Sequence, residues 1–103
     1  MQQPEINVEE MQLRAKDVSD LLKIMAHPER LMVLCQLTRG EVGAGQLQQS
    51  SSLSQSAFSQ HLSVLRKHGL VVVRKEAQLV YYSIADQRSS QIIESLEQIF
   101  CGK

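Results

Sequence analysis

The apolar residues of the first quarter of the chain recur at helical spacing. From about Val8 they step by four and three through a stripe made of Met11, Ala15, Val18, Leu22 and Met25, which is one face of an amphipathic helix. This helix should end near Ala26, because Pro28 disfavours helical geometry in the residue before it. Residues 1–7 are mostly polar and are expected to be disordered.

A second helix is predicted from Pro28, which suits a first helical turn, to Gly40, which suits a helix end. Its apolar stripe consists of Leu31, Leu34 and Thr38, with Cys35 beside it. The stretch from Gly43 to Ser50 allows at most a two-turn helix. Three consecutive serines then predict a polar turn.

The helix predicted from Gln55 to about His68 has the clearest start signal. Ser54 is a favourable N-cap, and Leu53 before it can pack on Phe58, as in a hydrophobic staple. Gly69 should close the helix and let Leu70 fold back on it. The inward face carries Phe58, Leu62 and Leu65, and the outward face carries Ser56, Ser59, Gln60, Ser63 and Lys67.

Two β-rich runs follow, Leu70 to Lys75 and Val80 to Ile84, with Glu76, Ala77 and Gln78 as a short loop. They predict a β-hairpin. A last amphipathic helix is predicted from about Asp86 to Cys101, with Ile92, Ile93, Leu96, Ile99 and Phe100 as its stripe. The order of elements predicts a mainly α fold, a winged helix-turn-helix, in one domain spanning residues 1–103.

The charges are unevenly distributed along the chain. Its 11 Lys and Arg residues balance 11 Asp and Glu residues. Between Val42 and Lys75, however, there are four basic residues and no acidic residue, while both flanks have a net negative charge. A basic central block between acidic flanks is expected if the centre contacts a polyanion.

The exposed face of the predicted 55–68 helix therefore becomes a candidate reader of the DNA major groove. Short polar side chains there can hydrogen-bond to base edges, and basic residues around it can contact phosphates. The DNA-binding candidates are Ser54, Gln55, Ser56, Ser59, Gln60, His61, Ser63, Arg66, Lys67, Arg74, Lys75 and Gln78. The alternative is an ordinary solvated helix face with a solubilising hairpin.

The stripes of the first and last helices exceed what so small a core can cover. The simplest partner is a second copy of the chain, so a homodimer through these two helices is expected. It would read a palindrome with half-sites about one helical turn apart. A monomer with both stripes folded inward is the alternative.

Two cysteines, Cys35 and Cys101, are separated by most of the chain. The sequence shows neither a signal peptide nor an apolar run long enough to span a membrane, so a cytoplasmic protein is expected. There a permanent disulfide is unusual. The thiols are therefore inert core residues, metal ligands or a redox pair.

Three separated motifs resemble the ArsR/SmtB repressors. They are Leu22 to Leu31, Leu53 to Arg66, and Arg74 to Gln78 followed by Tyr81 and Tyr82. The resemblance implies a dimeric winged-helix repressor whose interface is formed by the first and last helices and which leaves its operator when an effector binds. It also implies recognition-helix positions at Gln55, Ser56, Ser59, Gln60 and His61.

The cysteine pattern departs from the metal-sensing members of that family. No cysteine lies between Val42 and Ser54, and the last helix contains no histidine. Two thiolates are too few for a closed zinc site, so neither a metal nor a cofactor is predicted. The pair instead resembles the sulfur- and redox-responsive branch that includes the BigR-, SqrR- and HlyU-like regulators. There, reactive sulfur species bridge two such thiols and the repressor releases DNA.

The prediction is thus a DNA-binding repressor that is released when Cys35 and Cys101 are oxidised or bridged by reactive sulfur species. One alternative is an HlyU-like regulator that displaces other DNA-binding proteins without thiol sensing. A second is a metal-responsive repressor. An enzyme is not expected, because the chain has no Cys-x-x-Cys motif, nucleophile elbow or phosphate loop. A winged helix that binds only protein stays open as a further class.

Overall fold

The computed structural model describes residues 7–101, so the predicted disorder of residues 1–6 lies outside the described part of the chain. For Asn7 that prediction is wrong. Its side chain accepts a hydrogen bond of 3.1 Å from the backbone N–H of Glu10 and caps the first helix. The cap satisfies one of the N–H groups that every helix leaves unpaired at its start.

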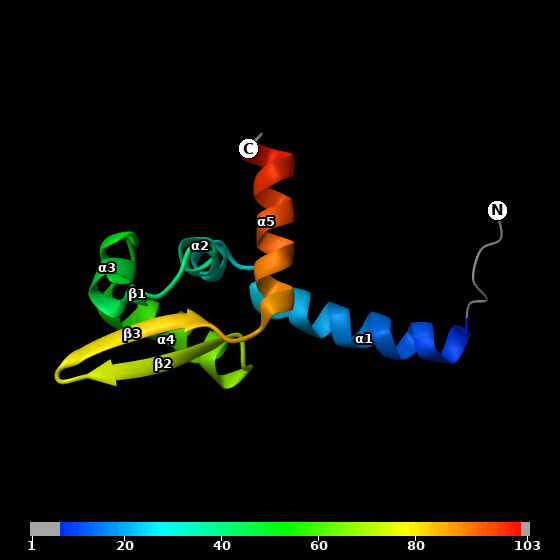
Figure 1. Ribbon diagram of the computed structural model, residues 1–103, viewed down its shortest axis with the longest axis horizontal. Coiled ribbons are helices and arrows are strands. Elements are labelled where there is room, and N and C mark those ends of the chain that lie inside the picture. Colours follow the sequence, from blue (N-terminus) through cyan, green and yellow to red (C-terminus); the bar gives the residue numbers. More distant parts are fainter. Residues whose placement is uncertain (1–6, 102–103) are drawn as a thin grey trace.

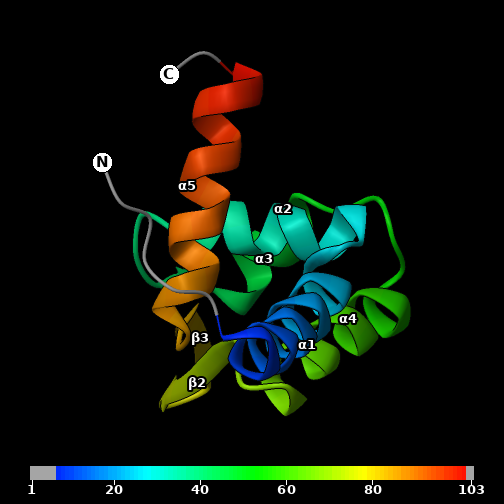
Figure 2. The same cartoon turned by 90° about the vertical axis from the view of Figure 1, so that its right-hand side faces the viewer.

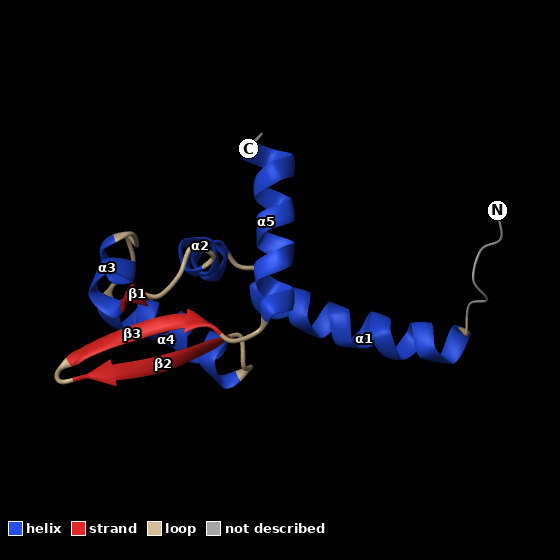
Figure 3. Ribbon diagram, viewed as in Figure 1, coloured by secondary structure: helices blue, strands red, loops and turns tan. Residues whose placement is uncertain are grey.

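The described residues form helices and one small antiparallel sheet, which lies at one edge of the molecule (Figure 1, Figure 3). In chain order the elements are α1 (Val8–Met25), α2 (Pro28–Leu37), β1 (Val42–Gly43), α3 (Ala44–Gln49), α4 (Gln55–Lys67), β2 (Val71–Glu76), β3 (Leu79–Ile84) and α5 (Gln87–Cys101). This is the predicted winged helix-turn-helix order. The fold class is confirmed.

Local signals at both ends fix α4. The Ser54 hydroxyl accepts a hydrogen bond of 3.2 Å from the backbone N–H of Ala57. At the other end Gly69 has a φ of 78°, and the N–H of Leu70 bonds back to the carbonyl of Leu65 at 2.9 Å. This is a Schellman motif, which needs a residue with left-handed geometry at the glycine position. The predicted cap and the predicted fold-back are both confirmed.

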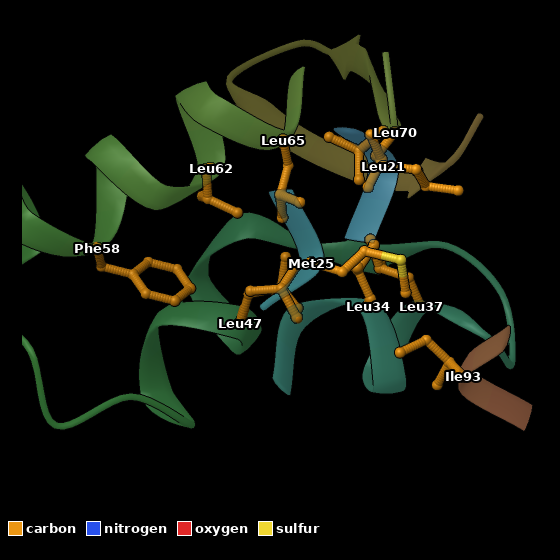
Figure 4. Packing of buried hydrophobic residues seen from close by; sticks show 12 residues of the cluster. Leu21, Met25, Leu34, Leu37, Leu47, Phe58, Leu62, Leu65, Leu70 and Ile93 are labelled. Carbon is orange, nitrogen blue, oxygen red and sulfur yellow. The ribbon is translucent and has the colours of Figure 1, made fainter. Parts of the chain in front are cut away.

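The core lies where α2, α4 and the first half of α5 meet α1 and the start of the sheet (Figure 2, Figure 4). Its buried side chains are Leu21, Met25, Val33, Leu34, Leu37, Leu47, Phe58, Leu62, Leu65, Leu70, Val71 and Ile93. The predicted inward face of α4 is therefore confirmed.

The stripe predicted for α2 is only partly right. Leu34 is buried, but Leu31 and Thr38 are half-buried, while Val33 and Leu37 are fully covered. The reason is that α2 packs against α4 on one side and α5 on another. A helix covered from two directions has a wider buried face than one stripe describes.

The sheet has one strand more than predicted. Its order is β1-β3-β2, and Val42 pairs with Tyr82. In the hairpin Glu76 pairs with Leu79, so the connection is the two residues Ala77 and Gln78, with Ala77 at a φ of 55°. The loop predicted to include Glu76 is thus one residue too long.

Much of the terminal stripes is exposed. The N-terminal part of α1 and the C-terminal part of α5 extend away from the rest of the fold (Figure 1). The exposed apolar side chains on these two helices are Val8, Met11, Leu13, Val18, Leu22, Ile99 and Phe100. In the described chain, therefore, the outer parts of these stripes are not folded inward, whereas Met25 and Ile93 at their inner ends are buried in the core.

Candidate DNA-binding surface and thiol pocket

The outward face of α4 is polar and exposed over its whole length. The predicted base-reading residues Gln55, Ser56, Ser59 and Gln60 are all exposed, as are Ser54, Ser63, Arg66 and Lys67. They lie opposite the buried Phe58, Leu62 and Leu65. The fold thus brings these side chains together on one accessible surface that contains no acidic residue.

His61 lies at the edge of this surface and faces the start of α2. Its ring centroid is 4.1 Å from that of His27, and its Nδ1 is 3.4 Å from a guanidinium nitrogen of Arg30. Burial, and then the charges of His27 and Arg30, lower the pKa of His61. The half-buried imidazole therefore favours its neutral form. Its predicted contact with DNA would then be a hydrogen bond and not a charge interaction.

Hydrogen bonds made by side chains at the start of α2 fix α4 relative to the helices before it. Arg30 donates a hydrogen bond of 2.5 Å to the carbonyl of Ile24 at the end of α1. Ser51, in the turn before α4, donates one of 2.7 Å to the carboxylate of Glu29. These bonds join α1, α2 and the helix-turn-helix unit, so α4 keeps a defined orientation relative to α1.

The hairpin places Lys75 and Gln78 in solvent, but Arg74 is engaged within the protein. Its guanidinium donates to both carboxylate oxygens of Glu41, at 2.7 and 2.9 Å, and to Glu76 at 2.8 Å. It also lies 4.6 Å from the centroid of the Tyr81 ring. These hydrogen bonds lower the pKa of Glu41. Two carboxylates beside Arg74 oppose the approach of a phosphate, so this side chain fastens the hairpin to the loop after α2.

The two cysteines, on different helices, line one open cavity of about 560 Å³. Cys35 on α2 is half-buried, and Cys101 at the end of α5 is exposed. The other lining residues are Gln36, Arg39, Val42, Gln46 and Glu97. The pKa of Cys35 is raised, first by burial and then by the negative charge of Glu97. The Cys35 thiol is therefore held protonated in its resting state.

Glu97 was missed as a site residue by the sequence prediction. One signal was available: it lies four residues before Cys101, which places the two side chains on the same face of a helix. Its proximity to Cys35 depends on the packing of α2 against α5, which the sequence pattern did not predict.

Among residues 7–101 no cluster of three or more His, Cys, Asp or Glu side chains has an arrangement that could hold a metal ion. Within the same described range, no helix has the length and apolar character needed to cross a membrane.

An exposed acid-free helix, placed second in a helix-turn-helix and followed by an antiparallel hairpin, defines the winged helix-turn-helix class of DNA-binding proteins. The model of the bacterial regulatory protein arsR family matches residues 27–73. The chain is also 37% identical over 100 residues to the biofilm growth-associated repressor of Xylella fastidiosa strain 9a5c, covering 97% of this chain and 88% of that protein.

Two further comparisons agree. The chain is 43% identical over 96 residues to the transcriptional activator HlyU of Vibrio cholerae, covering 93% of this chain and 89% of that protein. The solved structure of reduced HlyU from Vibrio cholerae matches with a TM-score of 0.85 at 43% identity, covering 90% of this chain and 98% of that one. The chain therefore belongs to the ArsR family, and it is a DNA-binding transcriptional regulator, not an enzyme.

Proposed function

We propose that this regulator binds a palindromic operator as a homodimer and represses transcription until Cys35 and Cys101 are bridged by reactive sulfur species. As a bacterial regulator acting on chromosomal DNA, it would work in the cytoplasm. The observation that carries the sensing proposal is that the two thiols, 66 positions apart in sequence, line the same cavity.

The exposed face of α4 would supply the base contacts. Gln and Ser side chains can hydrogen-bond to base edges in the major groove, and the N-terminal part of the second helix is the part that reaches them. Arg66, Lys67 and Lys75 are exposed and would contact phosphates, which position a protein on DNA without specifying sequence.

Replacing Gln60 by alanine should therefore weaken binding to the operator relative to random DNA by about 1–3 kcal/mol, the usual value of a lost base contact. Lys67→Ala should weaken binding to both DNAs alike. The operator would be selected from a random-sequence library with the wild-type protein, and affinities would be measured by fluorescence anisotropy. Gln91→Ala, an exposed glutamine on α5, is the matched control. Unchanged specificity in Gln60→Ala would remove Gln60 from the base-reading set.

The proposed sensing reaction has two steps. The exposed Cys101 reacts first, because the Cys35 thiol is half-buried and kept protonated. The Cys101 thiolate takes a sulfane sulfur from a polysulfide, which leaves one sulfur shorter. Cys35 then attacks the Cys101 sulfur and displaces hydrosulfide, which leaves a disulfide. If Cys35 also carries a persulfide, its terminal sulfur attacks and a trisulfide forms. Each inserted sulfur extends the reach beyond the Cα separation of about 7 Å that limits a disulfide.

The bridge would act on DNA binding through the dimer. Cys101 follows Ile99 and Phe100, which are 71% and 80% exposed and belong to the proposed interface. Tying the end of α5 to α2 would shift that interface relative to the core. Two recognition helices must enter the groove about 34–36 Å apart, so a small change of their separation would disfavour simultaneous binding of both half-sites.

Replacing either cysteine by serine should abolish the response. Reduced Cys35→Ser and Cys101→Ser should bind the operator like the wild type, since the cavity that both thiols line contains no residue of α4. After treatment with sodium tetrasulfide the wild type should lose affinity by at least about tenfold, or about 1.4 kcal/mol, and both variants should stay bound. Mass spectrometry should find the bridge, with added sulfur masses, only in the wild type. Release of DNA by either treated variant would contradict the two-thiol mechanism.

A second function, activation by displacing other DNA-binding proteins, is favoured by the name of one relative, the transcriptional activator HlyU, at 43% identity. Transcription in vitro from a promoter with the selected operator separates the two functions. Repression lowers transcript yield with polymerase alone, whereas displacement raises it only when a competing DNA-binding protein is present.

A further inference from the structure

The thiol pocket contains one carboxylate in a defined position. Glu97 is half-buried on α5, one helical turn before Cys101, and its negative charge is among the causes that raise the pKa of the Cys35 thiol on α2. All three side chains line the same cavity. A carboxylate beside a thiol raises the pKa of the thiol and so reduces its reactivity. If the pocket served only to make Cys35 reactive, no carboxylate would be expected there.

We infer that Glu97 is the proton acceptor for Cys35 when Cys35 closes the bridge onto modified Cys101. This role rests on the proposed sensing function and adds a third residue to it. Glu97 and Cys35 line the same cavity, so the group that receives the proton lies in the same cavity as the thiol that must lose it, as general base catalysis requires.

Cys101 carries a persulfide after reacting with a polysulfide. As the Cys35 sulfur attacks the inner sulfur of that persulfide, its S–H bond breaks and the proton moves to the Glu97 carboxylate. The S–S bond of the persulfide breaks, its terminal sulfur leaves as hydrosulfide with the bonding pair, and the Cys35–Cys101 disulfide bond forms. The polysulfide supplies the oxidising equivalents, and Glu97 ends the step as a carboxylic acid.

This arrangement makes bridging conditional on the first modification. Cys35 alone is a protonated, weakly nucleophilic thiol, since burial and Glu97 disfavour its thiolate. It becomes competent only when an electrophilic sulfur lies beside it, because the proton can then pass directly to Glu97. Among the described residues, the cavity is also lined by Cys101 and by the cation of Arg39, which lies two residues after the end of α2. An arginine cation cannot accept the proton, and Glu97 is the carboxylate among the residues that line this cavity.

The test is the pH dependence of bridge closure. Reduced protein is treated with sodium tetrasulfide, quenched with iodoacetamide and analysed by mass spectrometry, and the first-order conversion of the singly persulfidated chain into the bridged chain is followed. With Glu97 as acceptor, the wild-type rate should be nearly constant between about pH 6 and pH 8, because free thiolate does not have to form before the attack. In Glu97→Gln the reaction must wait for free thiolate, so its rate should rise about tenfold per pH unit. At pH 6 the variant should be slower by at least about tenfold, since general base catalysis contributes about 10²–10⁴-fold.

Two further variants complete the experiment. Glu97→Asp retains a carboxylate and should keep the flat pH profile at a reduced rate. Glu94→Gln makes the same charge change one turn earlier on α5, outside the thiol cavity and beside Ser90, and should behave like the wild type. If Glu97 serves only to disfavour the thiolate, Glu97→Gln closes faster than the wild type at every pH, and that result, or identical profiles, overturns the proposal while leaving sensing intact. Absence of any bridge in the wild type overturns both.

Discussion

Replacing Leu65 by alanine should lower the free energy of unfolding by about 2–5 kcal/mol, the usual cost of truncating a buried leucine without refilling the space. Leu65 has no exposed surface and points from α4 into the buried hydrophobic cluster (Figure 4). Small domains are stable by only about 5–15 kcal/mol, so this one change removes a large share of the total. Urea unfolding followed by circular dichroism measures it, at one protein concentration because dimerisation would contribute.

Leu79→Ala is the matched control for that change. Leu79 is 59% exposed at the tip of the hairpin, and truncation of an exposed side chain shifts stability by less than about 0.5 kcal/mol. Equal losses in the two variants would show that α4 does not contribute its inward face to the folding core.

The parts of the fold that the sequence predicted correctly are those with local causes. Ser54 caps α4 through a bond to a residue three positions away, and Gly69 ends the helix because the Schellman turn needs its positive φ. Both signals are contained in one stretch of chain. For the same reason the polar outward face of α4 followed directly from helical periodicity.

The parts that the sequence did not predict depend on distant contacts. Strand β1 has only two residues and exists because Val42 pairs with Tyr82, and two residues are too few to show alternation. Likewise His27 caps α2 with its ring nitrogen, which accepts from the N–H of Glu29 at 3.1 Å, although histidine is not among the usual capping residues.

The charge pattern illustrates the same limit. Along the chain, Arg74 belongs to an acid-free basic block, but the fold brings Glu41 from the acidic N-terminal flank within 2.7 Å of it. The charge pattern along the sequence therefore indicated correctly that α4 is basic. It did not show that Arg74 on the hairpin is paired with two carboxylates. Lys75 remains beside Arg74 as the exposed cation of β2.

Replacing Leu22 by glutamate should separate dimer formation from folding, and it has the largest effect expected on DNA binding. Leu22 is 44% exposed in the single chain and lies on the same helical stripe as Met11 and Val18, which are 52% and 46% exposed. A charge at an exposed position changes the stability of the protomer little. In a two-fold interface, however, each substitution appears twice, so two carboxylates would be buried without partners, at a cost of several kcal/mol.

The loss of DNA affinity follows from the loss of the dimer. When two recognition helices are joined, binding of the second half-site is effectively intramolecular, which raises affinity by about 10²–10⁴-fold. Leu22→Glu should therefore be monomeric by sedimentation and bind the full operator about as weakly as a single half-site, with an unchanged circular dichroism spectrum. Gln12→Glu adds the same charge to α1 away from the stripe and should remain a dimer. A dimeric Leu22→Glu with full affinity would move the interface off α1, and the bridge between Cys35 and Cys101 would then need a route to α4 other than the dimer.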